Sequence, residues 1–121
     1  MVIHQKILES AGAISKNYLA TENIFTEGES AQYYFQIVSG SVKMNNYDES
    51  GKEYIQNRLE AGECLGESFL FIDHQYPMNA VAINSCEVLS LKKSLFISLL
   101  QQNPKMCFEI NKNLSKKLHF K

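Results

Sequence analysis

Hydrophobic and polar residues follow three different patterns along this chain. In residues 3–14 the apolar positions recur at the spacing of one helix face. In residues 18–92 short runs of β-forming residues are separated by glycine, asparagine and aspartate. From residue 93 the apolar positions again recur with a helical period. The order predicts a short N-terminal helix, a region of strands and a C-terminal helical region.

The central region contains many short strands with turn residues at close intervals. This spacing is typical of an antiparallel jelly-roll barrel (a double-stranded β-helix, cupin-like), so the predicted fold is mainly β. One predicted strand, residues 52–59, alternates clearly. Strict alternation would place Gln56 and Arg58 on one face, and Ile55, Asn57 and Leu59 on the other.

Two helices are predicted in residues 93–121. The pair Asn103-Pro104 divides them, because asparagine suits a helix N-cap and proline suits the first helical position. The last helix carries an apolar stripe at intervals of four residues, formed by Met106, Ile110, Leu114 and Leu118. The stripe fits two arrangements, packing on the β-roll of its own chain or forming a parallel seam with a second copy.

The composition indicates one folded domain, residues 1–121, with 45% hydrophobic residues and a net charge of −1. Such a charge argues against binding DNA or anionic lipid by bulk electrostatics. The apolar runs are too short to span a bilayer, and no signal peptide is recognisable. The three cysteines, Cys64, Cys86 and Cys107, have no disulfide or metal spacing, so we expect reduced thiols in the cytoplasm.

No catalytic or metal-binding pattern is present in the sequence. The three histidines, His4, His74 and His119, are not spaced as metal ligands, and neither a nucleophile elbow nor a Walker loop occurs. The adjacent Asp73 and His74 are expected to be solvated turn residues. We therefore predict that the chain is not an enzyme and holds no metal.

The stretch GESFLFIDHQYPMNAVA, residues 66–82, has the features of an anion-binding loop. Gly66 permits a tight backbone at the start of a helical turn, where successive N–H groups can face an anion. Ser68 and Asn79 add side-chain donors, and Glu67 can accept from a sugar hydroxyl. Many turns show such features by chance, so the loop alone does not define a function.

A larger set of motifs resembles the cyclic-nucleotide-binding domain, and more narrowly the sensor domain of Crp/Fnr-type bacterial transcription regulators. The matching runs are IFTEGESAQYYFQIVSGSVKM (24–44), DESGKEYIQNRLEAGECLGE (48–67), PMNAVA (77–82) and CEVLSL (86–91). The resemblance covers roughly residues 6–120 and implies a phosphate-binding cassette at residues 66–80. In that family the residue matching Glu67 holds the ribose 2′-hydroxyl. The base packs on residues matched here by Met44, Leu59, Cys64 and Leu65.

The chain departs from the family motif at the phosphate. Pro77-Met78-Asn79-Ala80 stands where the resemblance implies Pro-Arg-Ser/Thr-Ala, so Met78 replaces the phosphate-binding arginine and Asn79 the hydroxyl. Repulsion between Glu67 and a phosphate would cost about 3 kcal/mol, and the lost clamp about 1.5–3 kcal/mol more. No cofactor is therefore assigned, and cyclic AMP is doubtful as a ligand. Three outcomes stay open: Met78 fills the pocket, the ligand is less anionic, or weak cyclic-nucleotide binding persists.

The resemblance also carries expectations about partners. In the resembled regulators the last helix pairs two subunits and leads to a helix-turn-helix domain, so we expect a homodimer and expect DNA to be bound only by a domain outside residues 1–121. The ending favours a fragment of a longer regulator over a free-standing domain. We thus predict a ligand-sensing regulatory domain with a diverged cassette. The alternative is a non-sensing dimerisation or protein-interaction module on the same fold.

Overall fold

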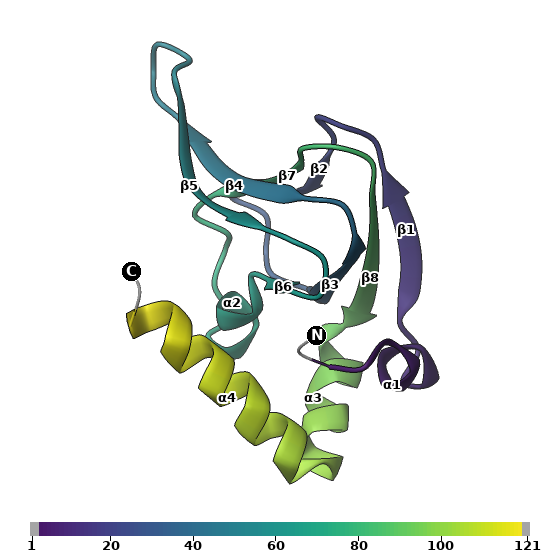
Figure 1. The fold of residues 1–121 in the computed structure, drawn as a ribbon. Coiled ribbons are helices and arrows are strands. Elements are labelled where there is room, and N and C mark those ends of the chain that lie inside the picture. The colour runs from purple at the N-terminus through teal and green to yellow at the C-terminus, as the bar shows by residue number, and fades with distance from the viewer. Residues whose placement is uncertain (1–2, 120–121) are drawn as a thin grey trace.

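Two antiparallel four-stranded sheets form the body of the protein (Figure 1). The computed structural model describes residues 3–119, with side chains through Lys117. The first sheet has the order β1-β8-β3-β6 and the second has the order β2-β7-β4-β5. The strands are β1 (Ile14–Tyr18), β2 (Asn23–Phe25), β3 (Tyr33–Ser39), β4 (Val42–Tyr47), β5 (Glu53–Leu59), β6 (Cys64–Leu65), β7 (Asn79–Ala82) and β8 (Cys86–Lys92).

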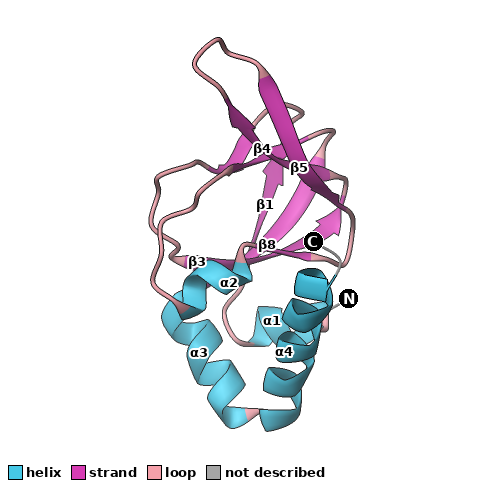
Figure 2. Cartoon of the chain, turned by 90° about the vertical axis from the view of Figure 1, so that its left-hand side faces the viewer, coloured by secondary structure: helices cyan, strands magenta, loops and turns pink. Residues whose placement is uncertain are grey.

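The helices gather at one end of this roll, as the turned view in Figure 2 shows. They are α1 (Gln5–Ser10), α2 (Glu67–Phe71), α3 (Lys93–Gln102) and α4 (Pro104–His119). The hairpin of β4 and β5 projects from the opposite end (Figure 1). The prediction of a mainly β jelly roll with an N-terminal helix and two C-terminal helices is confirmed.

The N-terminal helix is shorter than the predicted residues 3–14. Helix α1 begins after His4, whose Nδ1 accepts from the Lys6 N–H, and it ends at Ser10. Ile14 already belongs to β1, an edge strand whose first four residues are exposed. Because that strand shows little apolar alternation, the sequence pattern did not reveal it.

Ile3 lies outside the helix and is held by a side chain of β3. Its N–H donates to Gln36 Oε1 at 3.2 Å, and its carbonyl accepts from Gln36 Nε2 at 2.6 Å. Both Ile3 and Gln36 are buried. The Gln36 amide therefore satisfies both backbone hydrogen-bonding groups of Ile3, as a neighbouring strand would do.

Strand β5 departs from the predicted alternation because it contains a bulge. Met44 pairs with Asn57, but the next residue, Asn45, pairs with Ile55. Gln56 is thus an extra residue, and Ile55 comes to line the same outer cavity as Arg58. The prediction that Ile55 shares a face with Leu59 is wrong, since Leu59 is buried in the core and Ile55 is 43% exposed.

The start of the last helix is as predicted. Helix α4 begins at Pro104, and the Asn103 carbonyl accepts from the N–H groups of Met106 and Cys107. The Asn103 side chain instead donates to the Leu99 carbonyl at 2.8 Å, so it completes the end of α3. One residue therefore serves both helices of this corner.

The predicted stripe of α4 contacts its own chain. Ile110 is 1% exposed and belongs to the core, and Met106 and Leu114 are partly buried against it. The side chain of Leu118, the fourth member of the stripe, lies outside the described residues. These three side chains thus pack against the core of their own chain, and a seam with a second copy stays a prediction.

Candidate ligand-binding site

The predicted cassette begins at a glycine that no other residue could easily replace. Gly66 links β6 to α2 with φ +63°, a left-handed conformation that side chains disfavour. A Cβ at this position would lie 2.9 Å from Tyr76 Cε1 and 3.2 Å from Phe25 Cε2. The rings of Phe25 and Tyr76 stack at a centroid distance of 3.7 Å. Gly66 therefore lets the start of α2 lie against this aromatic pair.

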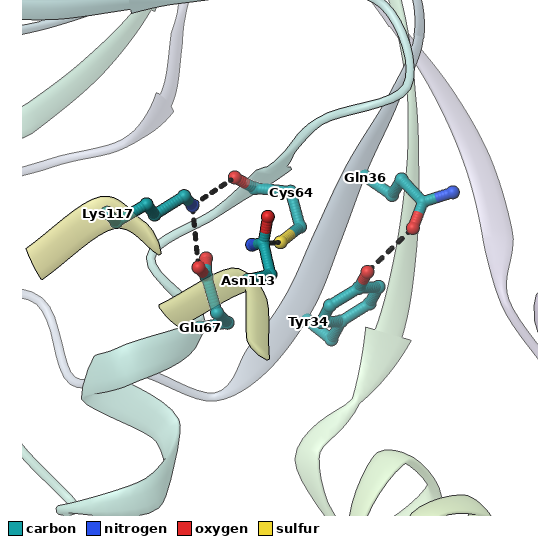
Figure 3. A network of polar contacts seen from close by, with 6 residues as sticks. All are labelled: Tyr34, Gln36, Cys64, Glu67, Asn113 and Lys117. Atoms are coloured by element: carbon teal, nitrogen blue, oxygen red, sulfur yellow. Dashed lines mark hydrogen bonds and ion pairs between the residues drawn. The ribbon is translucent and has the colours of Figure 1, made fainter. Parts of the chain in front are cut away.

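Glu67, the first residue of α2, is 2% exposed and is paired with a lysine of α4. Lys117 Nζ lies 2.6 Å from Glu67 Oε1 and 3.3 Å from the Cys64 carbonyl oxygen (Figure 3). The second carboxylate oxygen, Oε2, is buried and has no hydrogen-bond partner among the described residues. The carboxylate predicted to hold a ribose is thus occupied on one oxygen and unpaired on the other.

The ion pair keeps the Lys117 ammonium charged although its side chain is partly buried. Burial, the largest single influence, lowers the pKa of the Lys117 ammonium, but attraction to Cys64 and Glu67 outweighs it and the pKa is raised overall. Burial, followed by the Glu67 charge, raises the pKa of the Cys64 thiol to about 12. Cys64 is therefore neutral near pH 7, and Glu67 is the partner that holds the ammonium there.

Two further polar contacts lie close to this ion pair (Figure 3). Asn113 of α4 directs Nδ2 toward Cys64 Sγ at 3.6 Å. The Tyr34 hydroxyl donates to Gln36 Oε1 at 2.6 Å, and burial followed by the nearby Cys64 raises the pKa of Tyr34 well above its usual range. Helix α4 is therefore joined to Cys64 and Glu67 by polar contacts, and the Tyr34–Gln36 pair of β3 forms a separate hydrogen bond.

The residues expected at the phosphate have separate environments. Met78 is 9% exposed and belongs to the core, and Ala80 is fully buried opposite Met44. The Asn79 amide is engaged on both sides, since its Oδ1 accepts from the Glu27 N–H at 2.9 Å and its Nδ2 donates to Asn45 Oδ1 at 3.2 Å. Asn79 lines an outer cavity of the sheet.

The other expected site residues are also placed. Ser68 is exposed on α2. The four residues matched to the base pocket are all core residues, namely Met44, Leu59, Cys64 and Leu65. Arg58 lines the outer cavity, as expected from the inward position of Leu59.

Two residues of the site were not predicted from the sequence, Asn113 and Lys117. They follow Ile110 by three and seven positions, which is the spacing of one helix face. Since Ile110 is buried, both polar side chains point to the covered side of α4. The helical spacing from Ile110 could have identified Asn113 and Lys117, but only if the sequence had shown that Ile110 faces the core.

Two further classes of site receive no support from the geometry. Within the described part of the chain no three histidine, cysteine, aspartate or glutamate side chains gather as a metal would require. No helix among residues 3–119 is long and apolar enough to cross a membrane.

Known proteins similar to this chain are regulators. The family model of the cyclic nucleotide-binding domain matches residues 15–103. The cAMP-activated global transcriptional regulator CRP of Salmonella typhimurium is 32% identical over 102 residues, which cover 84% of this chain and 49% of that protein. This chain thus spans about half the length of such relatives.

Solved structures have the same fold. Thermus thermophilus catabolite activator protein superposes with a TM-score of 0.82 at 23% identity, over 97% of this chain and 56% of that one. A transcriptional regulator of Thermotoga maritima gives a TM-score of 0.88 at 18% identity, over 98% and 92% of the two chains. The chain belongs to the cyclic nucleotide-binding domain family, in the form that occurs in Crp/Fnr-type regulators.

Proposed function

We propose that this chain is the ligand-sensing domain of a Crp/Fnr-type transcription regulator, with α4 as the element that responds to the ligand. The observation that carries the proposal is the ion pair between Lys117 and the buried Glu67. It ties the predicted ribose-binding carboxylate to α4, the last helix of the described residues. A similar protein is named as cAMP-activated, and the DNA-binding part of such a regulator would lie outside these residues.

The mechanism follows from competition for one carboxylate. A ligand hydroxyl that donates to Glu67 would use the unpaired Oε2 and would then share the carboxylate with the Lys117 ammonium on Oε1. Sharing the carboxylate would weaken the ion pair, and with it the attachment of α4 to the cassette. The ligand would then shift the equilibrium between two positions of α4, which is what allosteric coupling requires.

The cassette supports weak binding of a cyclic nucleotide. Met78 offers no charge to a phosphate and is buried among apolar side chains. Lys117, however, neutralises Glu67, which removes most of the carboxylate–phosphate repulsion expected from the sequence. What remains is the lost arginine clamp of about 1.5–3 kcal/mol, or roughly ten- to a hundredfold in affinity.

Titration calorimetry with cyclic AMP tests this proposal. We expect binding weaker than micromolar, and a gain of at least roughly tenfold in Met78→Arg. Met78→Leu is the matched control, because it keeps an apolar side chain of similar size and should bind like the unchanged protein. Micromolar or tighter binding by the unchanged protein would contradict the diverged cassette, and no gain in Met78→Arg would show that the pocket is closed by other residues.

A second candidate is a non-sensing interaction module, which the burial of Met78 favours.

In either case we propose a cytoplasmic homodimer. Ile110 of the predicted seam packs in its own core, so pairing through α4 would use the outer face, where Phe108 is 66% exposed. Sedimentation of the chain and of Phe108→Ser tests this interface. Dimers that dissociate in the variant support it, and monomers in both proteins contradict it.

A further inference from the structure

A cavity lies on the outer face of the second sheet, away from the interior of the roll. It has a volume of about 250 Å³ and opens between β2, β7, β4 and β5 and the chain before β2. Its walls combine charged, polar and apolar side chains, chiefly Lys43, Tyr47, Ile55, Arg58, Asn79 and Val81. The interior of the roll and this cavity are on opposite faces of β7, since Ala80 belongs to the core while Asn79 and Val81 line the cavity.

Two cations stand directly opposite each other in this wall. Lys43 of β4 and Arg58 of β5 are paired across the antiparallel ladder. Like charges at directly opposed positions destabilise a sheet, so the arrangement costs free energy unless an anion lies between them. Arg58 forms no ion pair within 4.0 Å among the described residues.

Among the described residues, one carboxylate forms an ion pair with these two cations. Glu53 Oε2 lies 2.7 Å from Lys43 Nζ and also accepts from Asn45 Nδ2. The hydrogen bond from Lys43, followed by that from Asn45, lowers the pKa of Glu53, with a smaller contribution from the charge of Arg58. With Glu53 committed to Lys43, the wall keeps one positive charge, carried by the planar donor group of Arg58.

The polar groups of the wall are rigidly held. Asn45 is fully buried, and its amide links Glu53 to Asn79, which in turn accepts from the Glu27 N–H. Beside them Ile55 and Val81 provide an apolar surface. Ile55 reaches this surface only because of the bulge at Gln56. The Arg58 cation next to this apolar wall suits a ligand with one anionic end and an apolar body.

We propose that this cavity binds a small organic monocarboxylate, with its carboxylate on Arg58 and its apolar body against Ile55 and Val81. A single negative charge matches the single uncompensated cation, and a carboxylate matches the paired donors of a guanidinium. The volume of 250 Å³ limits the ligand to a compact molecule. The cavity shares Asn79 with the predicted cassette, but the proposal does not rest on the function of the cassette.

The test uses benzoate as the probe and benzamide as its neutral counterpart. In amide nitrogen–proton correlation spectra of the 15N-labelled chain, benzoate should give saturable shifts at residues around Arg58 and Val81 at millimolar concentration. Arg58→Gln should weaken binding by roughly tenfold or more. Lys92→Gln, which removes an exposed charge on the other sheet, should bind as the unchanged protein does.

Three results would overturn the proposal. They are the absence of saturable shifts with benzoate, equal binding of benzamide, and unchanged binding in Arg58→Gln. Circular dichroism of each variant establishes that the fold is kept, so that a loss of binding reports on the cavity. Shifts that centre on the cassette in place of β4, β5 and β7 would equally contradict the assignment.

Discussion

Removal of the Lys117 ammonium should destabilise the protein more than removal of the Glu67 charge. In Lys117→Met, Glu67 would be left as a carboxylate that is 2% exposed and has no cation. Breaking a fully buried ion pair in this way costs about 3–5 kcal/mol. Since the Lys117 side chain is 36% exposed, water can reach the site, and we expect about 2 kcal/mol.

The reverse change leaves a lysine that can turn toward water. Glu67→Gln keeps the volume and one acceptor, so we expect a cost of about 1 kcal/mol. The double variant should also cost about 1 kcal/mol, because the uncompensated charge is then absent. The coupling energy between the two positions is therefore about 2 kcal/mol, where independent sites would add to within about 0.5 kcal/mol.

Urea unfolding followed by circular dichroism measures each of these free energies. In thermal unfolding, Lys117→Met should lower the midpoint by about 6–10 °C for a chain of this size. Lys116→Met is the matched control, since Lys116 is an exposed neighbour on the same helix and should change stability by less than about 0.5 kcal/mol. Costs that add within that margin in the double variant would refute the ion pair as an energetic link between α4 and the cassette.

Three further outcomes are expected. Gly66→Ala should lower the free energy of unfolding in urea by about 2–3 kcal/mol, and Gly51→Ala by only about 1 kcal/mol. Both glycines have positive φ, but only at Gly66 would a Cβ lie within 3.4 Å of aromatic rings. Equal losses in the two variants would contradict this contact. A thiol reagent at pH 8 should modify the half-buried Cys107 well before Cys64, whose pKa is raised to about 12 by burial, and mass spectrometry of peptides would reveal the opposite order. Stability should fall as pH rises above about 9, because the unfolded chain loses the Cys64 proton at its ordinary pKa of 9.0 while the folded chain keeps that proton to about 12. The pKa of Lys117, which folding raises from 10.5, extends this loss of stability to higher pH. A flat stability profile between pH 9 and 11 would be contrary to this linkage.

Local chemistry made much of the fold predictable. The short runs of β-forming residues between turn residues and the Asn103-Pro104 pair both act on their nearest neighbours, and they predicted most of the elements. Strand β1 was missed because its side chains are exposed at the sheet edge, where apolar alternation is not needed. The bulge at Gln56 depends on pairing with β4, which no single segment of sequence encodes.

The candidate site was predictable only in its motif. Gly66 and Glu67 could be assigned by resemblance, since they lie within one short run. The partner of Glu67 is 50 residues away, on a helix whose inward face is set by the packing of Ile110. The sequence therefore predicted a missing cation at Met78, but it did not predict the Lys117 ammonium that α4 places beside Glu67.

The bulge in β5 gives this strand a tolerance to changes in length. Gln56 has no Cα partner across the ladder, whereas Ile55 and Asn57 are paired with adjacent residues of β4. Deleting Gln56 would leave every other pairing in place, with Leu59 in the core and Ile55 at the outer cavity. A single-codon deletion here should be nearly silent during evolution, while the same deletion in a strand without a bulge would turn part of the core outward.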